Sequence, residues 1–151
     1  MMTREATEQD LEVLLEFEQG IVSAERPFNS TLRDGEIHYY DLLQLIQSED
    51  SLVLVTEENN EVIASGYARI KKTENNYSDF DQYAYLGFMY VKPEHRGKGV
   101  NKLLLDELIR WARTKGISEV RLDVYAQNES AVKAYEKAGF ESLLITMRMK
   151  T

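Results

Sequence analysis

Residues 83–112 constrain the fold most, because the spacing of hydrophobic residues changes there within one short turn. The segment 83–91, YAYLGFMYV, is rich in aromatic and branched residues and predicts a β-strand. After Pro93 the apolar residues recur at helical spacing, at Val100, Leu104, Leu108 and Trp111. The linking segment, VKPEHRGKGVN, contains two glycines. The sequence therefore predicts a strand, a glycine-containing turn and a helix in direct succession.

The rest of the chain predicts an α/β fold with a mixed sheet, in which antiparallel strands come first and a parallel β-α-β unit follows. Two segments of strand character flank Asn59 and Asn60, residues that tolerate a positive φ, and so predict a hairpin. The other expected elements are a weak strand at 2–6, a helix opened by 7–10, a helix at 39–47, hairpin strands at 51–56 and 62–70, a strand at 119–125, a helix at 129–138 and a last strand at 143–150. We expect one domain over residues 1–151.

Composition excludes several classes of function. The chain has no cysteine and two histidines, so we expect no disulfide, no thiolate zinc site and no metal cofactor. Its formal net charge of −8 argues against binding to nucleic acid or to an anionic membrane, and would suit a cationic partner. No apolar run approaches the roughly 18 residues of a membrane span. We therefore expect a soluble cytoplasmic protein.

The turn before the second half of the chain is a candidate anion site. A strand that leads into a helix points unpaired backbone N–H groups and the positive end of the helix dipole at one place. Gly97 and Gly99 permit close backbone approach there, and Arg96, Lys98 and Lys102 add positive charge at the rim. On this stretch alone, a turn with solvated lysines is an equally good interpretation. The common phosphate-binding glycine signatures do not match.

A second motif, about thirty residues further on, favours the binding interpretation. Residues Asn128, Ala131, Tyr135, Gly139 and Phe140 fit the pattern N-x-x-A-x-x-x-Y-x-x-x-G-F, and Arg96, Gly99 and Asn101 fit Q/R-x-x-G-x-G/A except at the last position. With both motifs at this separation, the segment 85–140 resembles the GCN5-related N-acetyltransferase (GNAT) superfamily. Asn101 stands where that family has Gly or Ala, and we expect binding to survive the change.

The resemblance implies a fold, a co-substrate and its binding residues. The fold would be a central mixed sheet flanked by about four helices. The co-substrate would be acetyl-CoA, with its pyrophosphate on the backbone of the turn and its pantetheine arm beside the preceding strand. The binding residues so implied are Met89, Tyr90, Val91, Arg96, Gly97, Lys98, Gly99, Val100, Asn101, Lys102, Asn128 and Tyr135.

The resemblance also implies a chemistry, which is direct transfer of the acetyl group to a primary amine. Tyr135 would act as general acid toward the departing sulfur. The strand at 83–91 carries no carboxylate, so the candidate general base is Asp123 on the next strand. Water relayed by Tyr85 or Tyr90, or loss of the proton to solvent before binding, are the alternatives. The acceptor side would include Glu25, Phe28, Tyr39 and Tyr85.

The acceptor and the assembly are the least determined features. The negative charge favours a small cationic amine or a basic peptide. Eleven residues follow Phe140, where the family often has two strands, so the last strand is either shortened or paired across the interface of a homodimer. Two other functions remain open: an acyl-CoA-binding sensor without turnover, and a phosphate-binding module for another nucleotide.

Overall fold

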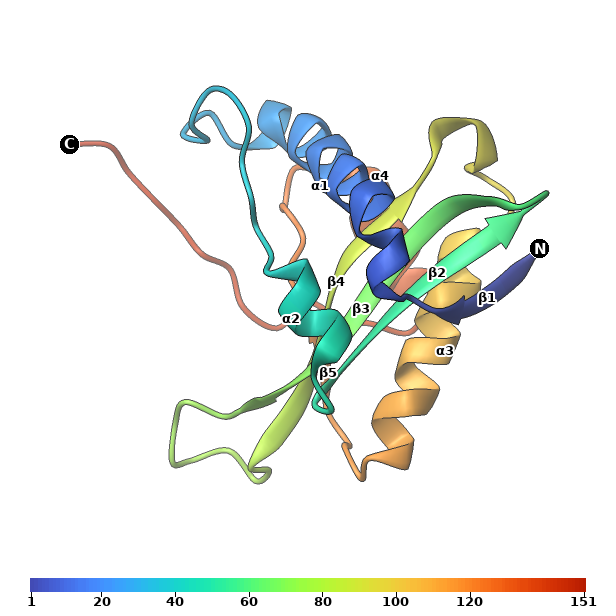
Figure 1. Ribbon diagram of the computed structural model, residues 1–151. Helices are drawn as coiled ribbons and strands as arrows, with labels where there is room; N and C mark the ends of the chain where they lie inside the picture. Colours follow the sequence, from blue (N-terminus) through green and yellow to red (C-terminus); the bar gives the residue numbers. More distant parts are fainter.

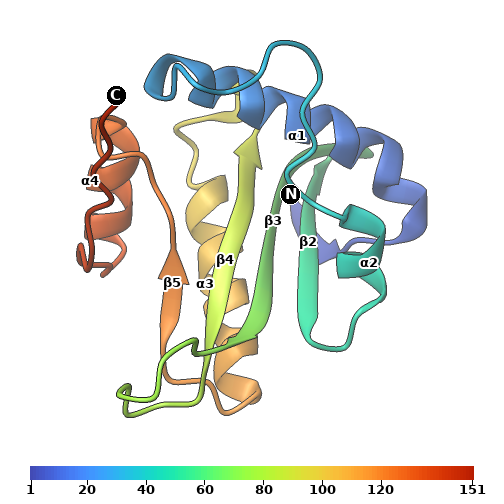
Figure 2. The same cartoon turned by 90° about the vertical axis from the view of Figure 1, so that its left-hand side faces the viewer.

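The computed structural model describes residues 1–151 and shows a twisted sheet with helices on both faces (Figure 1, Figure 2). The strands are β1 (Met2–Glu5), β2 (Ser51–Glu58), β3 (Glu61–Lys72), β4 (Gln82–Val91) and β5 (Val120–Leu122). The helices are α1 (Leu11–Glu25), α2 (Leu42–Gln47), α3 (Val100–Thr114) and α4 (Glu129–Lys137), with short 3-10 turns at Glu8–Asp10, Arg26–Phe28 and Pro93–His95. No helix is long and apolar enough to cross a bilayer.

The sheet topology confirms the predicted mixed architecture. The strands lie in the order β1-β2-β3-β4-β5, and all neighbours are antiparallel except β4 and β5, which are parallel. The predicted hairpin is formed by β2 and β3, and its turn residues Asn59 and Asn60 have φ values of 54° and 64°. Helix α3 connects the two parallel strands, as the sequence predicted.

Two hydrophobic cores fill the space between the sheet and its helices. Helices α1 and α2 cover one face, where Leu14, Phe17 and Leu45 pack with Val55 and Phe88 of the sheet. Helix α3 covers the other face (Figure 2). Its apolar residues at four-residue spacing, Val100, Leu104, Leu108 and Ala112, are fully buried, as the hydrophobic period predicts. Helix α4 lies beyond β5, at the end of the sheet.

A β-bulge in β4 separates the two parallel strands. Phe88 has a φ of 57°, a left-handed conformation that is unusual for a bulky residue. The pairing with β3 shifts register there, and the Ser65 hydroxyl donates a hydrogen bond of 3.0 Å to the Phe88 carbonyl. Beyond the bulge β4 continues to pair with β3, but β5 pairs only with Ala84–Leu86. The two strands therefore diverge toward the carboxyl end of β4.

The structure corrects two predicted strands. Strand β5 covers Val120–Leu122 rather than 119–125, because β4 turns away at the bulge and leaves the later residues without a partner. The last predicted strand, 143–150, is wrong: residues 141–151 form no helix or strand. Its alternating pattern favours a strand, but no neighbouring strand is present to complete the hydrogen bonds.

Candidate active site

The turn between β4 and α3 presents a row of unpaired backbone amides. The first backbone hydrogen bond of α3 is donated by Leu103 to the Gly99 carbonyl, at 3.2 Å. The amides from Gly97 to Lys102 donate no backbone hydrogen bond. Gly97 and Gly99 have φ values of 76° and 81°, and a Cβ at either position would meet no atom within 4 Å. Glycine is therefore required by the positive φ and not by lack of space, and the result is a concave row of amides of the kind that suits an anion.

The basic side chains of the turn are arranged differently from one another. Arg96 folds back, and its Nε donates a hydrogen bond of 2.9 Å to the Val91 carbonyl. Lys102 Nζ lies 2.6 Å from a carboxylate oxygen of Asp106, one helical turn further on. Lys98 is exposed and forms no ion pair. Arg96 thus fixes the shape of the turn, whereas Lys98 is free to contact a bound anion.

The edge of β4 beside this turn is open. From Gly87 to Val91 the strand pairs with β3 on one side and has no partner on the other. Alternate backbone amides and carbonyls along such an edge point away from the sheet. An extended amide-containing molecule can bind there as an additional strand, with its anionic end on the turn at Gly97 and Gly99.

Helix α4 lies beyond β5, and Tyr135 and Phe140 at its end pack against the core under α3 (Figure 2). Asn128 is its N-cap, and the side-chain oxygen accepts a hydrogen bond of 3.4 Å from the Ala131 amide. The Asn128 amide nitrogen donates to no other group of the chain. Tyr135, in the last turn, packs edge-to-face on Phe140 with ring centroids 5.9 Å apart. Burial, with a smaller effect of the Glu25 charge, raises the pKa of Tyr135, so its hydroxyl stays protonated at neutral pH.

A row of aromatic residues crosses the sheet face opposite α3. Tyr39 contacts Tyr40, Tyr40 contacts Tyr67 and Tyr67 contacts Tyr85, with centroid distances of 5.8, 5.6 and 6.4 Å. The Tyr85 hydroxyl then donates a hydrogen bond of 3.1 Å to the carboxylate of Asp123. The row thus leads from the segment after α1 to the residue that follows β5. Three of the residues expected at the site, Tyr39, Tyr85 and Asp123, lie at its two ends.

Glu25, the last residue of α1, places a carboxylate among these rings. Burial raises the pKa of Glu25, and its charge adds to the effect of burial in raising the pKa values of Tyr39, Tyr85 and Tyr135. The Tyr39 hydroxyl is buried without a hydrogen-bond partner of normal geometry, and its pKa is raised to about 12. The Glu25 charge therefore acts on tyrosines of β4, of α4 and of the segment before α2.

The 3-10 turn after α1 contacts the segment between β5 and α4. Phe28 stacks on Tyr125 with ring centroids 6.4 Å apart, and the Asn29 side chain donates a hydrogen bond of 2.8 Å to the Tyr125 hydroxyl. Phe28 was expected at the site from the sequence. Tyr125 was not, and its position three residues before the Asn128 cap is the signal that could have indicated it.

Glu18 was also missed by the sequence analysis, although it holds the aromatic wall in place. Its side chain is fully buried in α1. The carboxylate accepts hydrogen bonds of 2.9 Å from the amides of Tyr39 and Tyr40, and lies 2.8 Å from Nδ1 of His38. Residues 39 and 40 lie outside any helix or strand, and the Glu18 carboxylate accepts the hydrogen bonds that their backbone amides would otherwise make within such an element. The sequence signal is a glutamate between Phe17 and Ile21, on the apolar face of the helix.

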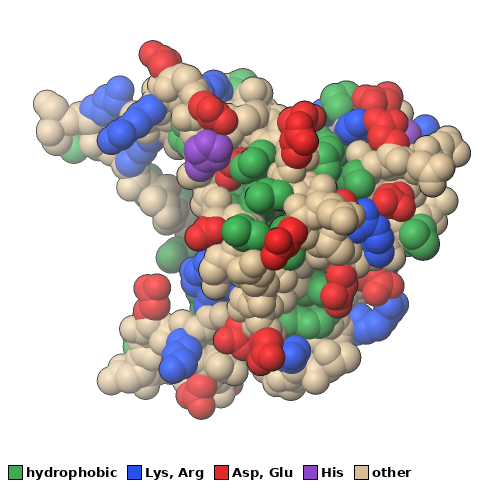
Figure 3. Space-filling model, viewed as in Figure 1, with side chains coloured by type: hydrophobic (Ala, Val, Ile, Leu, Met, Phe, Trp, Pro, Cys, Tyr) green, Lys and Arg blue, Asp and Glu red, His purple; other side chains and the backbone are tan.

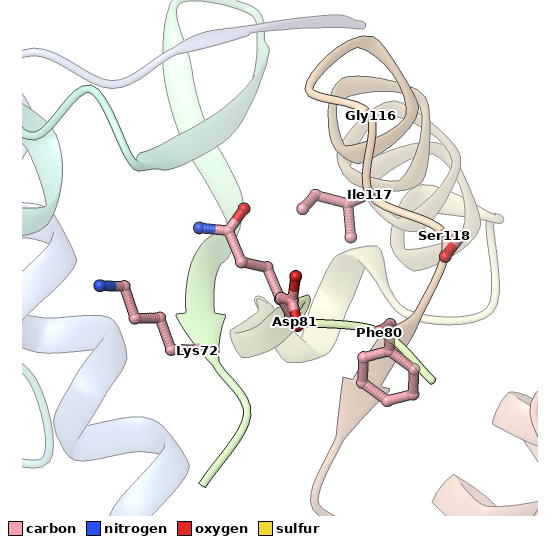
Figure 4. Close-up of a pocket in the computed structure, with 7 residues that line it drawn as sticks. Lys72, Phe80, Asp81, Gly116, Ile117 and Ser118 are labelled. Carbon is pink, nitrogen blue, oxygen red and sulfur yellow. The ribbon is translucent and has the colours of Figure 1, made fainter. Parts of the chain in front are cut away.

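On the face seen in Figure 3, acidic side chains are spread among basic and apolar ones. A separate, open cavity of about 440 Å³ lies at the opposite end of the sheet, between the β3–β4 and α3–β5 connections (Figure 4). Its lining includes Lys72, Asp81 and Ser118 but none of the residues expected to bind a ligand. The candidate site is thus the region beside β4, and not this cavity.

Comparison with known proteins agrees with this geometry. The family model for the acetyltransferase (GNAT) family matches residues 19–140, which is most of the chain. The chain belongs to the GNAT acetyltransferase family. The match includes both sequence motifs, the glycine turn and α4. The open edge of β4 and the aromatic row therefore lie within the part of the chain that matches this family.

Individual relatives support the GNAT assignment. The L-methionine sulfoximine/L-methionine sulfone acetyltransferase of Salmonella typhimurium is 31% identical over 109 residues, which are 71% of this chain and 58% of that protein. The chain thus spans little more than half the length of this relative. A tetramutant of the BH1408 protein from Bacillus halodurans has the same fold, with a TM-score of 0.88, 24% identity and complete coverage of both chains.

A third relative was solved with the expected co-substrate. It is a predicted acetyltransferase with acetyl-CoA from Clostridium acetobutylicum, with a TM-score of 0.73 and 20% identity, over 99% of this chain and 95% of that one. At this identity the similarity shows the GNAT fold alone.

Proposed function

We propose that the protein is an N-acetyltransferase that moves an acetyl group from acetyl-CoA to a primary amine by direct attack. The observation that carries the proposal is the row of amides from Gly97 to Lys102 without backbone partners, placed at the end of the open edge of β4. A pyrophosphate suits the first feature and an amide-containing pantetheine arm suits the second. A phosphate-binding module for another nucleotide would not need the open edge.

The residues around the thioester have separate roles in this proposal. The edge at Met89, Tyr90 and Val91 pairs with the pantetheine arm, and the free amide nitrogen of Asn128 contacts it from α4. Tyr135 donates a proton toward the sulfur as the thiolate leaves. Its raised pKa keeps the proton available, and also makes complete transfer less favourable than partial donation in the transition state.

The acceptor amine is received by the two carboxylates of the aromatic space. Asp123 is the proposed general base, with the Tyr85 hydroxyl bond fixing one carboxylate oxygen. Glu25 supplies a second negative charge beside Phe28 and Tyr39, and the aromatic faces attract a cationic group. Carboxylates and rings together favour a small cationic amine, or the side chain of a basic peptide. The amino-acid substrates named for the Salmonella relative carry a primary amine of this size.

The test combines binding and turnover in one sample. Thermal unfolding is followed with and without acetyl-CoA, and thiol release is then measured against polyamines, amino acids, aminoglycosides and basic peptides. Saturation to about 100 times Kd should stabilise the fold by about 2.7 kcal/mol, or roughly 5–11 °C. Because the chain has no cysteine, thiol reagents report only free CoA.

Each outcome of this test selects one function. A higher midpoint with thiol release supports the acetyltransferase and names the acceptor class. A higher midpoint without release by any amine supports the alternative function, an acyl-CoA sensor without turnover. The absence of both would contradict the proposed ligand, and would leave Gly97 and Gly99 with only the role of turning the chain.

A further inference from the structure

Strand β3 ends in a basic stretch, RIKK at 69–72, although the chain has a formal net charge of −8. Side chains alternate between the two faces of a strand, so Arg69 and Lys71 share the face that carries Tyr67 and the aromatic row. The register agrees, because Arg69 lies opposite Tyr85 of β4. Two cations of β3 therefore continue the line of the tyrosines.

This end of the sheet face is not covered by a helix. Figure 2 shows the face toward the viewer, where α1 crosses near the carboxyl end of β4 and α2 lies beside β2. Arg69 is exposed, and Lys71 is half-buried, with its Nζ 5.1 Å from the centroid of the Tyr85 ring. Neither cation forms an ion pair with a carboxylate of the chain. Both can therefore contact a molecule that lies on the tyrosines.

Tyr67 supplies an unpartnered hydroxyl next to these cations. Its side chain is almost fully buried, and its ring lies against Gly87, where a Cβ would come within 2.5 Å of a ring carbon and 3.0 Å of the hydroxyl oxygen. The hydroxyl forms no hydrogen bond within the chain, unlike those of Tyr85 and Tyr125. Burial raises the pKa of Tyr67, an effect that the Arg69 charge opposes and the Asp123 charge increases. A neutral phenol oxygen thus lies where the open edge of β4 begins.

Opposite charges lie at two levels of this face. The Tyr85 hydroxyl holds the Asp123 carboxylate at 3.1 Å, toward the carboxyl end of β4. Arg69 is level with the backbone of Tyr85, and Lys71 lies further toward the amino end of β4, since β3 and β4 are antiparallel. The spacing of strands and residues in a sheet puts the backbones of Arg69 and Asp123 about 12 Å apart. Their side chains and one small zwitterion together can span that distance.

We propose that Arg69 and Lys71 bind a carboxylate on the acceptor, and that the acceptor is an α-amino acid or another small amine that carries a carboxylate. Its amine lies at Asp123 and the Tyr67 hydroxyl, toward the open edge of β4, and its carboxylate lies at Arg69. The reverse orientation would place like charges together at both ends. A guanidinium suits this role, because it binds a carboxylate through two parallel hydrogen bonds.

The inference rests on the proposed function and narrows its acceptor class. A purely cationic amine, such as a polyamine, would meet Asp123 but would leave both cations of β3 without a partner. An amino acid satisfies the carboxylate and the cations at once. Its amine is also the end nearer to the open edge, where the pantetheine arm is proposed to bind.

The test compares acceptors that differ only in the carboxylate. Each L-amino acid of a panel is paired with its α-amide, as L-leucine with L-leucinamide, and thiol release from acetyl-CoA gives kcat and KM. Arg69→Gln should raise KM for the acids about 10- to 100-fold, with nearly unchanged kcat and with unchanged KM for the amides. Arg69→Lys should recover part of the loss, because it keeps the charge but not the paired hydrogen bonds. Ratios of variant to parent cancel the different basicity of the two amines.

Lys72→Gln is the matched control. Lys72 is an exposed cation on the other face of β3, where it lines the separate cavity (Figure 4), so its loss should change neither series. A parent protein that acetylates amides or polyamines as well as amino acids would refute the carboxylate subsite and leave the proposed function standing. Equal losses for acids and amides in Arg69→Gln would also refute it, since they would indicate a role in the fold or in acetyl-CoA binding.

A binding measurement gives a second readout that does not need turnover. Saturation-transfer NMR in the presence of CoA should detect the amino acids of the panel but not their amides, and the signal should weaken in Arg69→Gln. If CoA raises the unfolding midpoint while no amino acid binds, the inference fails and the cofactor part of the proposed function remains. If CoA does not bind either, the proposed function fails, and the inference fails with it.

Discussion

Replacing Glu18 by alanine tests how the segment that carries Tyr39 and Tyr40 is held in place. The buried carboxylate accepts two hydrogen bonds from the amides of Tyr39 and Tyr40, and a third contact comes from His38. A buried donor that loses its partner costs about 1–3 kcal/mol, so two amides cost about 4 kcal/mol together. For a domain of this length, a loss of that size lowers Tm by about 8–16 °C.

The assay for Glu18→Ala is urea and thermal unfolding, with Glu16→Ala as the matched control. Glu16 lies in the same helix, is exposed and forms no ion pair, so its loss should change stability by less than about 0.5 kcal/mol. Acetyl-CoA affinity should be nearly unchanged in the Glu18 variant, whereas the KM for the acceptor amine should rise. Equal stability of the two variants would refute the reasoning, since it would mean that water satisfies both amides after the carboxylate is removed.

Four further predictions concern the site and its pH dependence. Gly99→Glu should abolish acetyl-CoA binding measured by calorimetry. Gly99→Ala should weaken the affinity only by the amount that backbone strain at positive φ causes. Equal losses of affinity in the two variants would argue against a phosphate at the turn. Tyr135→Phe should lower kcat about 100-fold with unchanged acetyl-CoA affinity, and an unaltered kcat would exclude its acid role. Asp123→Asn should flatten the rising alkaline limb of the pH–rate profile, and an unmoved profile would indicate water or solvent as the base. The Glu18 carboxylate raises the pKa of His38 above its ordinary value of 6.5. The pair therefore stabilises the fold fully at a pH below 6.5, and this stabilisation is lost as the pH rises through the raised pKa. Unfolding midpoints between about pH 5 and 8 should therefore fall less steeply in His38→Gln than in the parent chain, and parallel curves would contradict this.

Local patterns in the sequence were sufficient to predict the β2–β3 hairpin and the segment from β4 through the glycine turn to α3. The change of hydrophobic period at Pro93 placed β4, the turn and α3, and Asn59 and Asn60 placed the hairpin. These features depend on neighbours along the chain. The positive φ of Phe88 could not be predicted in the same way, because the register shift between β3 and β4 imposes it.

The region around the aromatic row was harder to predict, because it depends on contacts between segments that are distant in the sequence. Glu18 reads as one of many acidic residues, yet its partners are twenty or more positions away. In the sequence, Tyr67 is an ordinary strand residue and Tyr125 an ordinary loop residue. Only the folded structure places Tyr67 beside Tyr85, and Tyr125 beside Phe28. The last strand was mispredicted for a related reason, since alternation at Leu143–Met149 indicates a strand but does not supply its partner.

The unpaired edge of β4 also allows ligand binding to be followed by hydrogen exchange, without any label on the protein. Amides near Met89–Val91 that point away from β3 have no intramolecular acceptor, and should exchange their hydrogen for deuterium quickly in the free protein. A pantetheine arm that bonds to them would slow this exchange, and the amides of Gly97–Lys102 would slow with them. Peptide-level mass spectrometry could thus rank acyl-CoA derivatives by their footprints alone, before any acceptor amine is known.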